Sequence, residues 1–209
     1  MTVLDKLASA QNRRDEVPNQ LLAKQLARTK NARDIQELAA NLWNKDKRIA
    51  FDCIKTLYEI CYIDPHLIHG YARDFLKLLH SRENRMVWGA MLALGTIAPL
   101  AADEIFAHYA DVVRAMERGS VITVDNAVKT LALVAAQKDA YRSKLFPILL
   151  KHIETCRPRS VAQHSEHTLA TIDARNKKRF IAALEKRMDI LTSTQQARVR
   201  RVMREAEKR

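Results

Sequence analysis

An apolar stripe that recurs every 37 residues constrains the fold of this chain more than any other feature. Three consecutive stripes share one spacing: Cys53-Ile54, Leu57 and Ile60; Ala90-Met91, Leu94 and Ile97; Ala127-Val128, Leu131 and Val134. A further step of about 38 residues leads to Leu169 and Ile172. Repeats of this length are typical of solenoids, in which each helical unit buries its apolar face against its neighbours. The chain is therefore predicted to be a linear array of helical units.

The composition favours an all-α protein of this kind. Glycine and proline together number nine, 4 and 5 respectively, which is about a third of average usage. Helix patterns come in pairs between short breaks: 2–13 with 18–29, 31–43 with 46–61, 65–80 with 84–98, 102–117 with 121–136, 139–154 with 158–172, and 176–191 with 194–208. Asp64 is expected to cap the helix that begins at Pro65, and Ser193 or Thr194 the last helix.

One unit resembles a repeat of the HEAT family. Leu78-Leu79 is followed by a polar turn at 81–84 and then by Ala93-Leu94-Gly95 and Ile97-Ala98. Arg85 lies two residues earlier than the family's pattern, which also leaves room for an Armadillo-like repeat. The resemblance implies a right-handed α-α superhelix, a HEAT/Armadillo-like solenoid of about five helix pairs with an N-terminal helical cap. A single domain over 1–209 is expected, with the cap at 1–30, repeats at 31–172 and a basic C-terminal repeat or cap at 173–209.

In the HEAT family the second helix of each pair lines a concave groove, so its polar positions are candidates for binding. Aligned columns read Phe51, Trp88, Asp125, Gln163, then Asp52, Gly89, Asn126, His164. Arginine suits bidentate contacts and tryptophan suits stacking, although any surface helix also needs a solvated face. The predicted binding residues of the concave groove are Arg48, Asp52, Lys55, Arg85, Trp88, Asp125, Asn126, Lys129, Arg159, His164 and His167.

Metal binding and catalysis find less support. His164 and His167 share one helix face, and Asp125 or Glu166 could add a third ligand, but this spacing is common by chance, so no metal and no cofactor is predicted. Cys156, beside Arg157 and Arg159, could have a lowered pKa, yet the sequence identifies no base for it. Cys53 and Cys61 fall on the apolar stripe and are expected to be core thiols. No catalytic or phosphate-binding motif is recognisable.

The positive charge is concentrated in the second half. Residues 1–104 carry a net charge of +2 and residues 105–209 a net charge of +10. Basic positions at 177–179 and at Arg198, Arg201 and Arg204 could track phosphates, or could form the polar face of a capping repeat. The sequence contains no membrane span and no signal peptide, and its odd number of cysteines favours a reducing compartment, so a cytoplasmic location and no membrane partner are expected.

These observations predict a non-enzymatic scaffold that binds a protein or peptide in its concave groove. The alternative is nucleic-acid binding through the basic half. One version of it resembles the HEAT-like alkylpurine DNA glycosylases, which place Trp, Asp and Arg on the concave face, as Trp88, Asp125 and Arg159 would here. The short Trp-to-Asp spacing of that family is missing, because Val121 stands four residues before Asp125.

Overall fold

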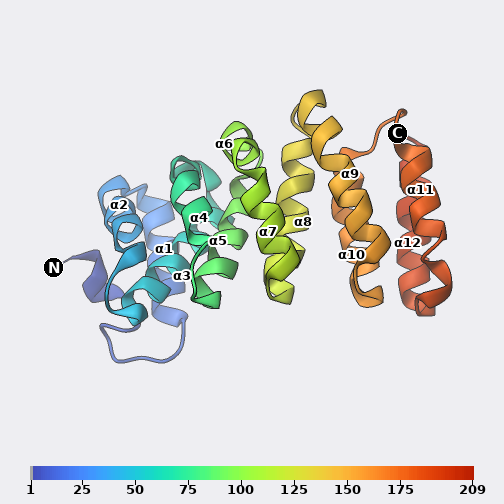
Figure 1. Cartoon of the computed structure of the whole chain (residues 1–209). Helices are drawn as coiled ribbons and strands as arrows, with labels where there is room; N and C mark the ends of the chain where they lie inside the picture. The colour runs from blue at the N-terminus through green and yellow to red at the C-terminus, as the bar shows by residue number, and fades with distance from the viewer. Residues whose placement is uncertain (1) are drawn as a thin grey trace. The chain divides into compact units, whose positions relative to one another are not determined.

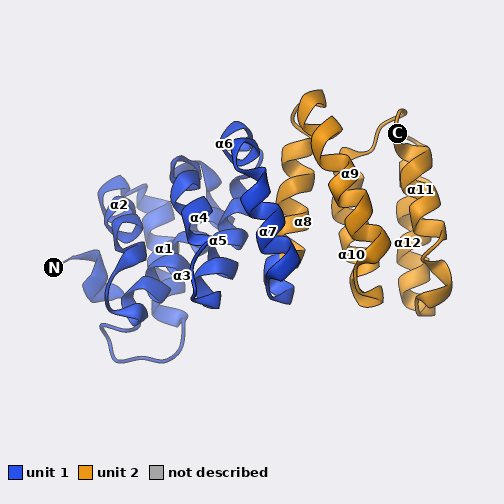
Figure 2. Ribbon diagram, viewed as in Figure 1, with its two compact units in different colours: residues 1–123 blue, residues 124–209 orange. Residues whose placement is uncertain are grey.

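The computed structural model describes residues 2–209, and all regular structure in that range is helical (Figure 1). The chain divides into two compact units, Met1–Thr123 and Val124–Arg209 (Figure 2), which are described separately. In the first unit the helices are α1 (Val17–Thr29), α2 (Ala32–Ala40), α3 (Lys47–Ile63), α4 (Ala72–Leu78), α5 (Asn84–Ile97), α6 (Ala102–Ala107) and α7 (Tyr109–Arg118). Helix α8 (Val121–Ala135) begins at the boundary, and α9 (Asp139–Thr155), α10 (Pro158–Thr168), α11 (Lys177–Glu185) and α12 (Ser193–Glu207) follow.

Helix contacts within each unit follow the alternation that the repeat predicts. In the first unit α1 packs against α3 and α3 against α5, while α4 contacts both α5 and α6. In the second unit α10 packs against α12, and α9 packs against α10 and α11. The second helices α1, α3 and α5 therefore lie next to one another in the first unit, and α10 and α12 do so in the second. Whether the two units form one continuous domain stays a prediction.

The apolar stripe is buried throughout, including Leu169 and Ile172 of its fourth copy. Leu57, Leu94 and Leu131 are fully buried, and Leu169 is 8% exposed. A step of 37 residues, kept constant, leads from the third stripe to four polar residues, all of them buried: His164, Ser165, Thr168 and Thr171. Leu169 and Ile172, which the step of about 38 predicts, are buried as well. His164, 1% exposed, lies in the core, whereas the aligned columns had placed it among the polar positions of the groove.

The segment 2–13 is not the helix that its pattern predicts. Its only regular structure is a 3-10 turn, Val3–Lys6. The next backbone amides bond to side chains elsewhere in the unit: Ala8 N donates to Asn19 Oδ1 at 3.0 Å and Ser9 N to Asp52 Oδ2 at 2.7 Å. These bonds replace the bonds that a helix would make within itself, so long-range polar contacts decide the local conformation.

Two further helices are interrupted and one cap differs. The range 65–80 opens with two 3-10 turns before α4, and the range 102–117 breaks at His108 into α6 and α7. The carboxylate of Asp64 accepts from His66 N as expected. The cap of α12 is Thr192, one residue before the predicted pair: its hydroxyl accepts from Gln195 N, and the Gln195 side chain accepts from Thr192 N.

Candidate functional site

The eleven predicted binding residues are divided between the two units, and the structure places them in local networks. Arg48, Asp52, Lys55, Arg85 and Trp88 belong to the first unit, and the other six to the second. Several are engaged by neighbours that the sequence pattern did not identify. Each unit therefore has its own candidate surface, built from its own contacts.

In the first unit, a buried ammonium group connects α3 with the residue directly before α1. Lys55 is 6% exposed, and its Nζ lies 2.8 Å from Glu16 Oε2 and 2.7 Å from Glu59 Oε1. The same Nζ lies 4.8 Å from the centre of the Tyr58 ring. Burial alone would lower the pKa of Lys55, but the hydrogen bonds with Glu16 and Glu59 raise it above its usual value. Lys55 is thus a fixed cation under this surface.

Glu16 is the residue that sequence reasoning missed here. Its second oxygen, Oε1, accepts from Arg85 Nη2 at 2.7 Å, so this carboxylate joins the cations of α3 and α5. The guanidinium of Arg85 also lies 5.4 Å from the centre of the Phe51 ring. Glu16 belongs to the segment before the repeats, where no 37-residue period could point to it. We call Glu16, Lys55 and Arg85 the ionic bridge.

An aromatic cluster lies beside the ionic bridge. The ring of Trp88, half-buried on α5, is tilted against Tyr58 with 5.9 Å between ring centres. Tyr58 in turn meets Tyr62 edge to face at 6.0 Å, and Tyr62 is 52% exposed. We call Tyr58, Tyr62 and Trp88 the aromatic cluster. Buried Tyr58 supports the rings of Trp88 and Tyr62, which keep exposed surface, as an anchor for a partner requires.

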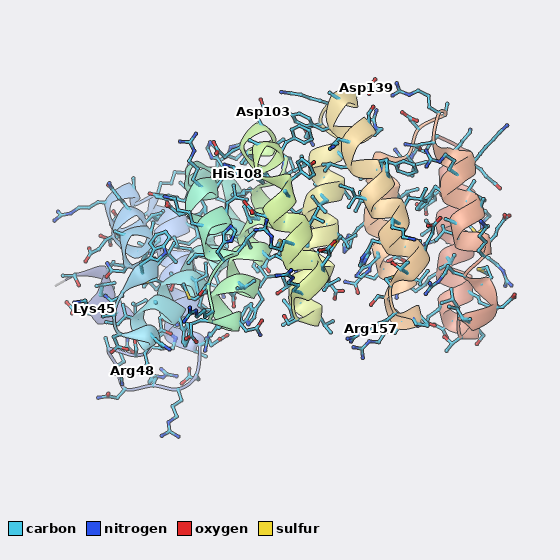
Figure 3. The ribbon with its side chains drawn as sticks, viewed as in Figure 1. Lys45, Arg48, Asp103, His108, Asp139 and Arg157 are labelled. Atoms are coloured by element: carbon cyan, nitrogen blue, oxygen red, sulfur yellow. The ribbon has the colours of Figure 1, made fainter. Side chains whose placement is uncertain are left out.

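Residues of α3, of α5 and of the segment before α1 line a pocket. Its volume is about 520 Å³, and Glu16, Arg48, Phe51 and Arg85 are among the residues that line it. Arg48 is exposed at the first turn of α3 (Figure 3), where its guanidinium lies 2.9 Å from Asp46 Oδ2. Two members of the ionic bridge, Glu16 and Arg85, therefore belong to the wall of this pocket.

Asp52 is buried and serves the fold of the N-terminal segment. Its Oδ1 accepts from Asn19 Nδ2 at 2.7 Å and its Oδ2 from Ser9 N at 2.7 Å. Asn19 itself is fully buried. Both carboxylate oxygens of Asp52 thus have partners within the chain, which gives this side chain a structural role.

In the second unit, a chain of hydrogen bonds runs through Asp125, His164 and His152. His164, 1% exposed on α10, lies with Nε2 at 2.8 Å from Asp125 Oδ1 of α8. Since a carboxylate accepts, Nε2 carries a proton, and in the neutral ring Nδ1 is then an acceptor. His152 Nε2 lies 3.0 Å from that Nδ1 and donates to it. Burial, followed by the nearby His164, lowers the pKa of His152 to about 4, so its imidazole is neutral at pH 7.

The thiol of Cys156 completes a group of three donor atoms. One ligand atom each from His152, Cys156 and His164 lies within 4.8 Å of the other two. Burial raises the pKa of the Cys156 thiol, and the guanidinium of Arg187 lowers it by less. The lowered pKa suggested by Arg157 and Arg159 was therefore wrong: both side chains are exposed, and Figure 3 labels Arg157 at the start of α10.

The remaining predicted residues of the second unit do not join this group. His167 is half-buried, and burial, followed by the charge of Lys129, lowers its pKa. Asn126 and Lys129 are half-buried on α8, and Arg159 is exposed on α10. The side chain of Glu166, considered as a metal ligand with His167, instead lies 2.6 Å from Arg198 and 3.0 Å from Arg201.

Part of the basic C-terminal surface is engaged within the chain. Arg198 and Arg201 share the carboxylate of Glu166, and Lys177 Nζ donates to the backbone carbonyls of Glu207 and Arg209 at 2.9 Å each. These contacts leave fewer unpaired cations along one line than the sequence suggests.

Comparison with known proteins identifies the fold. No family model matches the sequence, and no curated protein is significantly similar to it. Among solved structures, a designed armadillo repeat protein in complex with the peptide (KR)4 is 16% identical, with a TM-score of 0.68 over 98% of each chain. A computationally designed armadillo repeat protein for modular peptide recognition is 16% identical, with a TM-score of 0.66 over 97% of this chain and 98% of that one.

An engineered protein is similar over a smaller part of its own length. It is 17% identical, with a TM-score of 0.69 over 98% of this chain and 58% of that chain. Together these likenesses define the chain as an all-α, armadillo-like helical solenoid, as the repeat predicted, and at this identity they concern the fold alone. Within residues 2–209, no helix is both long and apolar enough to cross a membrane.

Proposed function

We propose that the chain is a non-enzymatic scaffold that binds an extended peptide segment of a partner protein. The binding surface is the face of α1, α3 and α5 that carries the aromatic cluster and the ionic bridge. The observation that carries this proposal is the position of Trp88 and Tyr62, with exposed ring surface, beside cations and carboxylates already held in place. The same fold serves peptide recognition in the designed proteins named above.

Preorganisation is the physical reason for this choice. Binding costs free energy when long side chains must be ordered, about 0.5–1.5 kcal/mol for each. Here Lys55 and Arg85 are ordered before any partner arrives, because Glu16 bonds to both. Trp88 rests on Tyr58 and loses little freedom on contact. Tryptophan and arginine in such positions are the residue types that dominate binding energy at interfaces.

The two tryptophans allow a direct test. Trp43 is 52% exposed between α2 and α3, and the Trp43→Phe chain keeps Trp88 as its only tryptophan. Peptides are selected from a displayed random library for binding to the full chain. A selected peptide should change the fluorescence of Trp88 when it is added to this variant. With the Kd of a selected peptide in hand, Trp88→Ala should weaken binding at least about thirtyfold, which is about 2 kcal/mol.

Matched controls separate this surface from the rest of the first unit. Trp43→Ala removes the other tryptophan and should leave the Kd unchanged, whereas Glu16→Gln, which weakens the ionic bridge, should weaken binding. If Trp88→Ala and Glu16→Gln both bind the selected peptide as the unchanged chain does, the proposed surface is wrong. If the library yields no peptides that compete with one another for a single site, the proposed function is wrong.

Nucleic-acid binding is the alternative that the same protein sample can test. Residues 124–209 carry 19 basic and 9 acidic side chains. Six phosphate contacts would give log affinity for duplex DNA a slope of about −5 against log salt. We expect weak binding with a slope shallower than about −2, since Arg198, Arg201 and Lys177 have partners in the chain. In the version that resembles the alkylpurine DNA glycosylases, Asp125 would face the concave side. Here its carboxylate already accepts a hydrogen bond from His164. A steep slope that Arg198→Ala and Arg201→Ala flatten would favour the nucleic-acid alternative.

A further inference from the structure

We propose that His152, Cys156 and His164 bind one divalent cation of the zinc class, with Asp125 hydrogen-bonded to the ligand His164. His152 lies in the last turn of α9, and Cys156, four residues later, is the residue directly after that helix. His164 comes from the middle of α10 and Asp125 from α8. The site is independent of the peptide-binding face in the first unit.

The distances among the three donor atoms suit a tetrahedral ion. With bonds of about 2.0 Å to nitrogen and 2.3 Å to sulfur, tetrahedral zinc places its donor nitrogens about 3.3 Å apart and nitrogen about 3.5 Å from sulfur. The two imidazole nitrogens are 3.0 Å apart, and the thiol sulfur lies within 4.8 Å of both. The sulfur has to approach by at most about 1.3 Å. Its polar contact is a long one, 3.7 Å to Ile153 O, so little opposes that approach.

Asp125 sets the tautomer that coordination needs. Because its carboxylate accepts from His164 Nε2, the lone pair of Nδ1 is directed toward His152. A carboxylate hydrogen-bonded to a metal-binding imidazole is a recurrent arrangement that orients the ring and makes it a better ligand. Asp125 is half-buried on α8, and His164, on α10, is 1% exposed.

The proton balance of binding is simple. In the metal-free chain His152 Nε2–H donates to His164 Nδ1. On binding, the cation takes the place of that proton, and His152 adopts the tautomer protonated on Nδ1. The Cys156 thiol loses its proton to solvent and binds as thiolate, so one proton is released for each cation bound.

The donor set favours zinc over harder cations. Two imidazoles and one thiolate are ligands for zinc and its neighbours in the transition series, whereas magnesium and calcium prefer oxygen. Three protein ligands leave one tetrahedral position for a water or a substrate atom. The alternative use of Cys156, as an activated nucleophile, requires a lowered thiol pKa, and burial raises it here.

Cobalt provides a spectroscopic probe of the site. The full chain, free of any histidine tag and freed of metal with a chelator, is titrated with Co²⁺ and then with Zn²⁺. We expect visible ligand-field bands and a thiolate-to-cobalt charge-transfer band that saturate at one equivalent and are bleached by one equivalent of Zn²⁺. Absence of a saturating charge-transfer band would overturn the proposal.

Variants assign the ligands. Cys156→Ser should abolish the charge-transfer band, and Asp125→Asn should retain its shape but weaken Co²⁺ affinity about 10–100-fold. His167→Gln removes a histidine from the same helix as His164, and His69→Gln one from an exposed pair, and neither should change the titration. A charge-transfer band that persists in Cys156→Ser, or that His167→Gln removes, would refute this assignment.

A second measurement on the unchanged chain guards against a variant that does not fold. Zn²⁺ should slow the alkylation of Cys156 by iodoacetamide at least tenfold, as mass spectrometry of the modified peptide can show. Once the chain is unfolded in chelator, Cys53 and Cys61 should be modified to the same extent whether or not Zn²⁺ was present before. Alkylation of Cys156 at the same rate with and without Zn²⁺ would contradict coordination by its sulfur.

Discussion

Replacing Asp52 by alanine should release the N-terminal segment from the first unit. The carboxylate accepts two hydrogen bonds, from Asn19 Nδ2 and from Ser9 N, each 2.7 Å long. Asn19 in turn holds the amide of Ala8 at 3.0 Å. Hydrogen bonds to a charged group contribute about 1.5–3 kcal/mol each, and a buried donor left without a partner adds to the loss. We therefore expect Asp52→Ala to cost about 3–5 kcal/mol.

Hydrogen exchange measures this loss where it occurs. Since each 1.4 kcal/mol corresponds to a factor of ten, a loss of 3 kcal/mol predicts that the amides of Ala8 and Ser9 exchange at least about a hundredfold faster. Asp52→Asn keeps one acceptor oxygen, so its exchange rates at Ala8 and Ser9 should lie between those of the unchanged chain and those of Asp52→Ala. As a control, Asp74→Ala removes a half-buried carboxylate whose partner, Lys77, is exposed and 3.9 Å away, and it should change stability by less than about 0.5 kcal/mol. Unchanged exchange at Ser9 in Asp52→Ala would refute the reasoning.

Three other predictions follow from burial and charge. Leu94→Ala should lower the free energy of unfolding in urea by about 2–5 kcal/mol, because this side chain is fully buried, and a loss below about 0.5 kcal/mol would contradict the packing. Burial raises the pKa of Cys53 to about 12, so a thiol reagent at pH 8 should label half-buried Cys156 first and Cys53 only on unfolding, as mass spectrometry can show; equal rates would contradict this. The hydrogen bond from Arg198 lowers the pKa of Glu166, so the ion pair should stabilise the fold at pH 7 and lose this effect as pH falls below about 4. Glu166→Gln should therefore lower the urea midpoint at pH 7 but not at pH 3. A difference in midpoint that persists at pH 3 would count against the ion pair.

The repeat could be predicted from sequence because helix packing depends on the period of apolar side chains, which one chain displays directly. Leu57, Leu94 and Leu131 are buried as that period requires. The cap at Asp64 was equally local, since its carboxylate bonds two residues ahead. Features with short sequence separation and a simple residue code were therefore recovered.

The parts that could not be predicted depend on partners far along the chain. The segment 2–13 has helical spacing, but its amides bond to side chains up to 43 residues away. Glu16 contacts Arg85 across 69 residues. His164 was placed among the polar residues of the groove because the alignment paired it with Asn126, and the sequence does not show that Asp125 and His152 bond to it.

The buried polar stripe of α10 also fixes how its helix can be aligned. The hydroxyls of Ser165, Thr168 and Thr171 bond to carbonyls of their own helix turn, so they would be satisfied in any alignment. His164 alone reaches other helices. Sliding α10 by one residue would leave the apolar contacts partly intact but would separate this ring from α8 and α9, at the cost of a buried polar group without partners. One imidazole thus selects a single alignment of α10 among several that apolar helix surfaces alone would permit.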